Sequence, residues 1–304
     1  MKRQHESLIR ILIVLALVPG TLTCASASRK VADTGTFSFA IIGDAGRWNA
    51  NTKSVQKSIS DDGIRNLILP GDNLYDERKQ TSSYADIWSH WPGFNFEVVA
   101  IGNHYKSYSE EEQYFKMPGE YFSKVVDKDI RFEVLNSDDD DKGQEQADWL
   151  DRDLKHASEK FIFLVYHHPT YNVCIYHKWQ QKEKFQTALR TVIWKNRDKI
   201  TGIIVGHEHV AALLTFNDLP VIVSGAAMET IPYIADDYSE GEVHVKTQWN
   251  YEKVPYWTRL DLNTGTAEAT VSFVRAKDSH VSCTAKISGK NLELGDNCKS
   301  SAKQ

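Results

Sequence analysis

Short runs of apolar residues recur through most of the chain, and small polar residues follow nearly every run. Such runs, rich in Val, Ile and Phe and bounded by Gly, Asn or Asp, are typical of buried β-strands. The pattern therefore predicts strands at residues 36–42, 64–69, 96–101, 130–136, 161–166, 202–206, 211–216 and 221–224.

Between these runs, apolar residues recur three and four positions apart, as they do on one face of an amphipathic helix. This spacing predicts helices near residues 51–62, 84–91, 144–157 and 185–193. Strands that alternate with helices indicate an α/β fold, in which right-handed crossovers join parallel strands.

The last third of the chain is less regular. Residues 226–255 show little periodicity, so we expect a long loop there. Residues 256–262 and 267–275 flank Asn263-Thr264-Gly265, a turn sequence that predicts a β-hairpin. Beyond residue 275 the pattern fades, and we expect a loosely held C-terminal tail.

Composition and charge are those of an ordinary globular protein. The 304 residues are 41% hydrophobic and 25% charged, which is enough apolar material for a full core. The net charge of -5 gives no indication of the basic surface that binds a nucleic-acid duplex. No repeat or linker interrupts residues 36–275, so one domain is expected there.

The N-terminus has the pattern of a secretory signal peptide. Basic residues precede the apolar run at 11–18, and Ala25-Ser26-Ala27 is a small-residue cleavage site. Cleavage after Ala27 implies a secreted, periplasmic or extracellular protein without a stable membrane span. Two alternatives stay open: an uncleaved anchor, and a lipid anchor at Cys24, for which the preceding Thr23 is unfavourable.

Cysteines near the C-terminus suggest a disulfide. An exported protein permits such bonds, so a Cys283–Cys298 bridge across the tail is expected. If Cys24 is lost with the signal peptide, Cys174 is left as a free thiol.

Side chains that can bind metal ions follow five of the predicted strands, at Asp44, Asp72, Tyr75, Asn103, His104, His167, His207 and His209. Since ligands of open α/β sheets bind at the carboxyl ends of the strands, we expect these side chains to converge. The set has no cysteine, which argues against a thiolate zinc or iron–sulfur site. Two cations held about 4 Å apart can clamp both ends of an in-line displacement at phosphorus. The pattern therefore predicts a dinuclear metal site.

The order of the motifs resembles that of the calcineurin-like metallophosphoesterases: Gly-Asp-x-Gly, Gly-Asp-Asn-x-Tyr, Gly-Asn-His, His-x-Pro and Gly-His-x-His. Tyr75 and the short chain resemble the purple acid phosphatases, in particular the small, tartrate-resistant type. The resemblance covers most of residues 36–225 and implies a four-layer α/β/β/α sandwich with two mixed β-sheets. The implied layout is a signal peptide at 1–27, a metallophosphoesterase catalytic domain at 28–276 and a tail at 277–304.

The resemblance also implies how the metal ions are held. A trivalent iron would take Asp44, Tyr75, His209 and a bridging Asp72. A divalent iron, zinc or manganese ion would share the bridge and take Asn103, His167 and His207. Any one of these residues could instead be a turn, packing or capping residue, as an Asp after Gly often is. Their joint occurrence in order favours the metal centre.

Two histidines are implied on the substrate side of the metals. His104 would donate a proton to the leaving oxygen or stabilise charge, and with Asn103 and His177 it would contact the substrate. The tartrate-resistant pattern places the second histidine one residue earlier, at Tyr176. Tyr105 is a further departure, because the family usually has an acid there.

The implied function is an exported acid phosphatase that hydrolyses small phosphate monoesters by attack of a metal-activated hydroxide. A phosphodiesterase acting on cyclic nucleotides or a phospholipid headgroup is the alternative, because the motifs build the metal centre and not the pocket wall. A binding protein that kept the fold and lost catalysis is a third possibility.

Overall fold

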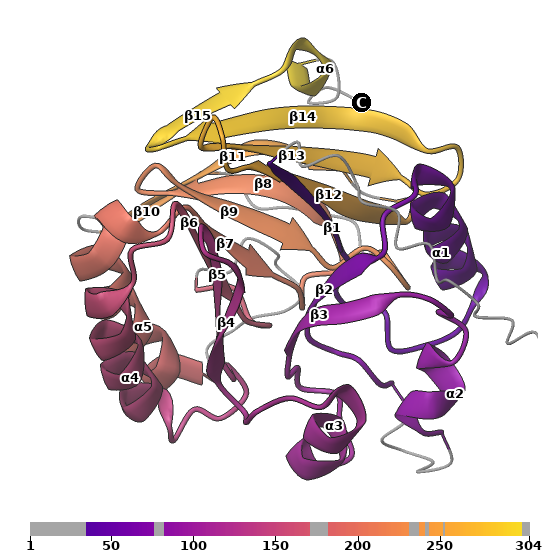
Figure 1. Cartoon of the computed structure of the whole chain (residues 1–304), viewed down its shortest axis with the longest axis horizontal. Helices are drawn as coiled ribbons and strands as arrows, with labels where there is room; N and C mark the ends of the chain where they lie inside the picture. Colours follow the sequence, from indigo (N-terminus) through magenta and orange to yellow (C-terminus); the bar gives the residue numbers. More distant parts are fainter. Residues whose placement is uncertain are drawn as a thin grey trace, which may run out of the picture. The chain divides into compact units, whose positions relative to one another are not determined.

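Two β-sheets stack face to face, and helices cover the outer face of each (Figure 1). The computed structural model describes residues 35–75, 82–170, 182–230, 237–240, 243–251 and 253–299. All of these belong to one compact unit, Gly35–Gln304. The expected signal peptide at 1–27 lies outside the described residues.

The first sheet has seven strands in the order β15-β14-β13-β12-β1-β2-β3. β1 pairs in parallel with β2, which pairs in parallel with β3, whereas the other neighbours are antiparallel. The strands span Thr36–Ile41 (β1), Asn66–Pro70 (β2), Asn95–Ala100 (β3), Tyr256–Asn263 (β12), Glu268–Arg275 (β13), His280–Ser288 (β14) and Asn291–Leu294 (β15).

The second sheet has eight strands in the order β10-β11-β8-β9-β7-β6-β5-β4. Its central neighbours β5, β6, β7 and β9 run parallel, and its edges are antiparallel. The strands span Phe122–Asp127 (β4), Ile130–Val134 (β5), Phe161–Val165 (β6), Gly202–Val205 (β7), Ala211–Phe216 (β8), Leu219–Ser224 (β9), Tyr238–Glu240 (β10) and Val243–Tyr251 (β11).

The helices connect strands or follow the last strand, and α5 is followed by a 3₁₀ turn at Arg197–Lys199. Their bounds are Ala50–Asp62 (α1), Tyr84–Trp88 (α2), Tyr108–Phe115 (α3), Gly143–His156 (α4), Glu183–Asn196 (α5) and Asp296–Lys299 (α6). α1 begins at a capping box on Asn49 and ends at Gly63, whose left-handed backbone closes the last turn.

Three apolar clusters separate the four layers. The central cluster lies between the sheets and includes Phe39, Phe132, Phe163 and Trp249. A second packs α4 and α5 on the eight-stranded sheet, and a third packs α1, α2 and α3 on the seven-stranded sheet. The predicted α/β/β/α sandwich of two mixed sheets is therefore confirmed.

The expectation of a long loop over residues 226–255 was wrong. β10 and β11 lie there, and β11 extends the sheet along β8. Val245 and Trp249 are buried, whereas Lys246 between them is exposed. Polar residues between the buried ones make this strand difficult to recognise from the sequence. A bulge between Thr247 and Trp249 also interrupts the period of two.

The expectation of a loosely held tail was wrong as well. β14 pairs with β13 along most of its length, and β15 pairs with β14. Cys283 faces the central core and is bonded to Cys298, so the expected disulfide is present. The predicted hairpin over 256–275 is confirmed as β12 and β13. Cys174 lies outside the described residues.

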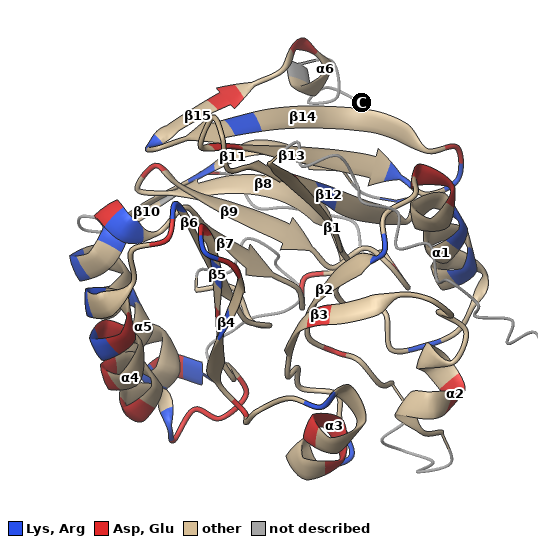
Figure 2. Cartoon of the chain, viewed as in Figure 1, with Lys and Arg blue, Asp and Glu red and all other residues tan. Residues whose placement is uncertain are grey.

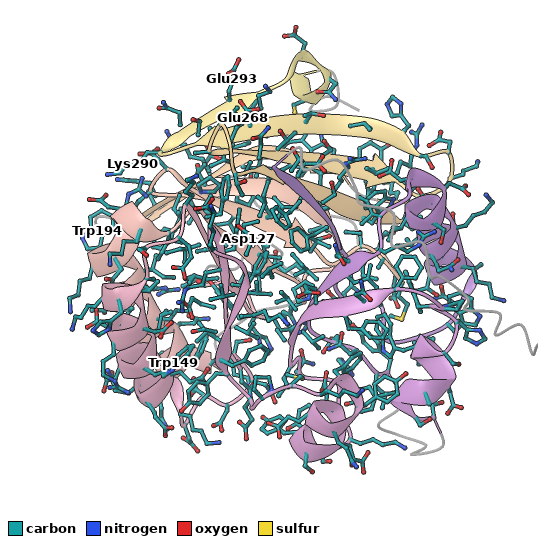
Figure 3. The ribbon with its side chains drawn as sticks, viewed as in Figure 1. Asp127, Trp149, Trp194, Glu268, Lys290 and Glu293 are labelled. Atoms are coloured by element: carbon teal, nitrogen blue, oxygen red, sulfur yellow. A yellow bond between two sulfur atoms is a disulfide. The ribbon has the colours of Figure 1, made fainter. Side chains whose placement is uncertain are left out.

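The outer surface carries charges of both signs. Figure 2 shows basic and acidic residues interspersed over α4 and α5, and Lys195 of α5 pairs with Asp151 of α4 at 2.8 Å. Among the exposed large apolar side chains is Trp194, at the periphery of the molecule in Figure 3. Within the part of the chain that the structure describes, no helix is long and apolar enough to cross a bilayer.

Candidate metal centre

The predicted ligands lie on loops at the carboxyl ends of strands from both sheets. Asp44 follows β1, Asp72 and Tyr75 follow β2, and Asn103 follows β3 in the first sheet. His167 follows β6 in the second sheet, and His207 and His209 follow β7. The structure thus brings together residues that are up to 165 positions apart because parallel strands present their carboxyl ends at one edge.

The first group of donors surrounds the Tyr75 hydroxyl. Its oxygen lies 2.9 Å from Asp44 Oδ1, 2.8 Å from Asp72 Oδ2 and 3.1 Å from His209 Nε2. His209 Nε2 lies 3.3 Å from Asp44 Oδ1. Asp44, Asp72 and His209 can together hold a metal ion, and Tyr75 would complete the predicted iron site.

The second group of donors surrounds the Asn103 side-chain oxygen. Asn103 Oδ1 lies 3.1 Å from His167 Nε2 and 3.0 Å from His207 Nδ1, and these two nitrogens are 3.3 Å apart. Asp72 Oδ1 lies 3.3 Å from His167 Nε2. One carboxylate oxygen of Asp72 therefore belongs to each group, as a bridge between two ions requires.

Three of these residues have a strained backbone conformation. Asp44, Asp72 and His207 have φ values of 55°, 55° and 64°, in the left-handed region that L-residues with side chains seldom adopt. Each such position costs on the order of 1–3 kcal/mol and persists where the surroundings enforce it. Strain at three predicted ligands indicates that the strand ends are shaped for the site, a feature that the motifs alone did not reveal.

Glycines let the loops approach the donors closely. A Cβ on Gly102 would lie 2.1 Å from Asp72 Oδ1, and one on Gly71 would lie 2.5 Å from His167 Nδ1. A Cβ on Gly206 would lie 2.8 Å from Asp44 Oδ2. These three motif glycines therefore make room for the ligands that lie beside them.

The buried charges of the site are strongly coupled. Burial would raise the pKa of Asp72, but the neighbouring His167 and His104 outweigh it and hold that pKa below its usual range. Burial likewise opposes protonation of His167, yet Asp72 and Asp44 raise its pKa to about 9. Burial and the two aspartates raise the pKa of the Tyr75 phenol. The Tyr75 oxygen lies 2.9 Å and 2.8 Å from two buried carboxylates, and such a group of oxygen donors with imidazole nitrogen beside it fits a multivalent metal ion.

His104 lies beside the bridge rather than in either group. Its backbone N–H donates to Asp72 Oδ1 at 2.9 Å, and its Nε2 lies 4.0 Å from Asp72 Oδ2. Its ring packs on the Tyr75 ring with centroids 4.5 Å apart. Tyr105 instead packs on Tyr108. The position of His104 is thus set by Asp72 and Tyr75, without an acid at residue 105.

His177 lies outside the described residues, so its predicted place beside the substrate stays a prediction.

Hydrogen bonds among residues that were not predicted to be ligands support the loop after β2. Asn73 Nδ2 donates to Glu111 Oε1 at 2.6 Å, and Trp88 Nε1 donates to the Asn73 carbonyl at 2.9 Å. The fully buried Glu111 also accepts from Tyr84. Local sequence gives no signal that Glu111 on α3 would reach the loop after β2.

Comparisons with solved structures identify the fold. The chain is similar to GAP50, the anchor in the inner membrane complex of Plasmodium, with a TM-score of 0.62, 14% identity and coverage of 84% of this chain and 90% of that one. It is equally similar to the purple acid phosphatase PPD1 from yellow lupin (Lupinus luteus), with a TM-score of 0.62, 14% identity and 83% of this chain covered. The match spans 54% of the lupin protein. PhoD gives a TM-score of 0.53 at 10% identity, over 85% of this chain and 71% of that one.

No family model matches the sequence, and a search of curated proteins finds no match. The chain shares a metallophosphatase-like fold with GAP50, the lupin purple acid phosphatase and PhoD, at low sequence identity. Two neighbouring groups of histidine and aspartate side chains form a candidate dinuclear metal site within that fold.

Proposed function

We propose that this protein is an exported, dinuclear metal-dependent acid phosphatase that hydrolyses small phosphate monoesters. The observation that carries the proposal is the convergence of two donor groups on Asp72, whose carboxylate oxygens each contact one group. When bound, the two ions would supply an activated hydroxide and neutralise the phosphoryl oxygens. An iron(III) ion in the first group and a divalent iron, zinc or manganese ion in the second suit these donors.

The chain's own residues would position the ester and move the proton. Asn103 and His104 lie on the same loop after β3, so both can reach a phosphoryl group placed over Asp72. His104 can donate a proton to the leaving oxygen as a general acid. His177 is proposed as the second substrate-side histidine.

Export is part of the proposal. The signal-peptide pattern at residues 1–27 supports it. The Cys283–Cys298 disulfide offers independent support, because such bonds persist in oxidising compartments.

The fold alone does not imply catalysis. A Plasmodium protein described as an anchor shares it as closely as a lupin phosphatase does. What favours an enzyme over a binding protein is the complete donor set, because a scaffold has no need of strained ligands at Asp44, Asp72 and His207. A phosphodiesterase on the same metal centre is the second candidate, since the described residues fix the metal donors and not the pocket wall.

A panel of esters assayed with metal analysis tests the proposal. We expect two metal ions per chain and faster turnover of aryl and alkyl phosphate monoesters than of diesters and cyclic nucleotides. Preference for diesters would support the second candidate, and no turnover by fully loaded protein would support a binding role. Tyr75 as a phenolate on iron(III) should give a visible charge-transfer band that is lost in Tyr75→Phe. A colourless iron-loaded wild type would reject the iron–tyrosinate assignment alone.

A further inference from the structure

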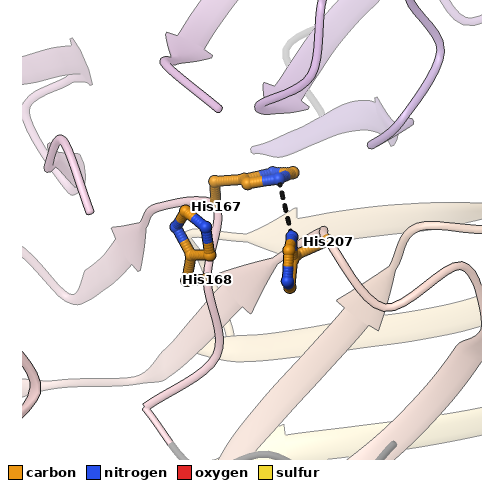
Figure 4. Close-up of side chains that lie close together, drawn as sticks. All are labelled: His167, His168 and His207. Carbon is orange, nitrogen blue, oxygen red and sulfur yellow. Dashed lines mark hydrogen bonds between the residues drawn. The ribbon is translucent and has the colours of Figure 1, made fainter. Parts of the chain in front are cut away.

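His168, the neighbour of the predicted ligand His167, also faces the second donor group. It is 3% exposed, and one ring nitrogen from each of His167, His168 and His207 lies within 4.8 Å of the others. The rings of His168 and His207 have centroids 4.4 Å apart. Figure 4 shows the three rings around one point, with one nitrogen of His168 turned to the His207 side. The motif resemblance gives no role to this histidine.

The surroundings of His168 match those of a metal-bound histidine. Its Nδ1 lies 2.8 Å from Ser137 Oγ, so Nε2 is the nitrogen that can bind an ion beside His207. His167 has the same arrangement, with Nδ1 2.9 Å from the Pro70 carbonyl oxygen and Nε2 among the donors. Histidine ligands characteristically donate their second N–H to an oxygen in this way, which fixes the tautomer.

Ser137 is fully buried and is held in turn by the same histidine. Its Oγ accepts the backbone N–H of His168 at 2.9 Å, so ring and backbone share one partner. The ring plane is therefore fixed before any ion binds.

We propose that His168 is a third imidazole ligand of the ion in the second donor group, an inference that rests on the metal centre of the proposed function. Two nitrogens each about 2.1 Å from one zinc-like ion can be at most about 4.2 Å apart. With tetrahedral angles that separation falls to about 3.4 Å, so nitrogens that lie within 4.8 Å of one another need to approach by at most about 1.4 Å to bind the same ion. Asn103 and Asp72 complete the set with oxygen atoms.

A set of three imidazoles changes the metal preference of this position. Imidazole nitrogen suits Zn²⁺ and Fe²⁺, whereas Mg²⁺ and Mn²⁺ favour oxygen ligands. The second position should therefore select zinc or ferrous iron strongly over manganese. Two imidazoles and two oxygens would discriminate less.

Zinc affinity distinguishes a ligand from a supporting residue. Losing an outer partner of a ligand lowers metal affinity about 10–100-fold, so loss of a ligand should exceed that range. We expect His168→Gln and His168→Ala to weaken zinc binding at the second position by more than about 100-fold, measured by competition with a chelator. Ser137→Ala should fall within the outer-partner range. His280→Gln, which alters an exposed histidine on β14, should leave the affinity unchanged.

Diffraction from crystals of the zinc-loaded wild-type protein tests the same point without a variant. Anomalous difference maps should place zinc about 2.1 Å from His168 Nε2. A zinc ion bound to His167 and His207 but more than about 3 Å from His168 would overturn the inference and leave the proposed function standing. A loss of less than about 100-fold in both His168 variants would overturn it too. Absence of zinc from both donor groups would instead count against the proposed metal centre.

Discussion

The backbone N–H of His207 donates to Asp44 Oδ2 over 2.8 Å, although 163 positions separate the two residues. This bond joins the loop after β1 in one sheet to the loop after β7 in the other. Both residues have left-handed backbone, so each helps to hold the other in a conformation that it would not adopt alone. The two sheets are thereby locked together at the metal centre.

The glycine before His207 gives a way to disturb this contact without removing a ligand. An alanine Cβ at residue 206 would lie 2.8 Å from Asp44 Oδ2 and 2.8 Å from the Pro70 carbonyl oxygen. We expect Gly206→Ala to weaken metal binding at the first position about 10–100-fold, because Asp44 must move. Gly119→Ala is the matched control, since its nearest atom would be 3.8 Å away. Equal metal affinity in both variants would show that the contact does not position Asp44.

Asp72 and His104 should separate metal binding from proton transfer. Asp72→Ala removes the bridge, so binding at both positions should weaken. His104→Ala should keep both ions and lower kcat by about 10²–10⁴-fold, the range for loss of a general acid. Metal analysis and steady-state kinetics on the same preparations check this. Similar metal loss in the two variants would make His104 a ligand.

A buried carboxyl group outside the two donor groups should make stability depend on pH. Burial raises the pKa of Glu133 from 4.5 to about 8, against the opposing effect of Ser123 and Arg131. Because the folded pKa exceeds the unfolded one, stability is full below about pH 4.5 and falls as pH rises toward 8. At about 1.4 kcal/mol per unit, the loss is at most about 5 kcal/mol. Urea unfolding should show this slope in wild type and a reduced slope in Glu133→Gln; identical slopes would refute the assignment.

The disulfide should stabilise the C-terminal strands and leave the metal centre alone. It spans 15 positions, for which the chain-entropy model gives about 3 kcal/mol. Cys283→Ser should lower the midpoint of thermal unfolding and speed proteolysis after β13, with kcat nearly unchanged. Thiol counting on denatured, unreduced mature protein should find one thiol, Cys174. Three free thiols would show that the bridge does not form.

The sequence predicted the parts of this fold that have a regular local pattern of apolar and polar residues. Apolar runs located the central strands, and the carboxyl-end rule gathered Asp44, Asn103 and His207 at one edge. The sequence did not predict strands that bury little of their surface: β4 has no fully buried residue, and β11 carries polar residues between its buried ones. A strand whose alternate residues are polar and whose pairing contains a bulge resembles a loop in the sequence, because the strands beside it are not known at that stage.

In the candidate site, too, the features with a local sequence pattern were predicted and those that depend on tertiary packing were not. The two donor groups were predicted from the resemblance of the motifs to a known family, and the structure brings these side chains together. The supporting contacts arise from tertiary packing and have no local signature. Glu111 reaches Asn73 from a helix 38 positions away, and Ser137 reaches His168 across 31 positions. The left-handed backbone of Asp72 and His207 is likewise imposed by the fold, because it is uncommon for any residue other than glycine.

Removal and return of the metal ions, followed by hydrolysis of a simple aryl phosphate monoester, tests whether this protein is a dinuclear metal-dependent phosphatase. Active protein should contain two metal ions per chain, lose its activity when a chelator removes them, and regain it when iron and zinc are restored. Asp72→Ala should not recover under the same treatment. Metal-free protein that hydrolyses the ester as fast as the loaded form would contradict the proposed function, as would protein with two bound ions that hydrolyses neither monoesters nor diesters.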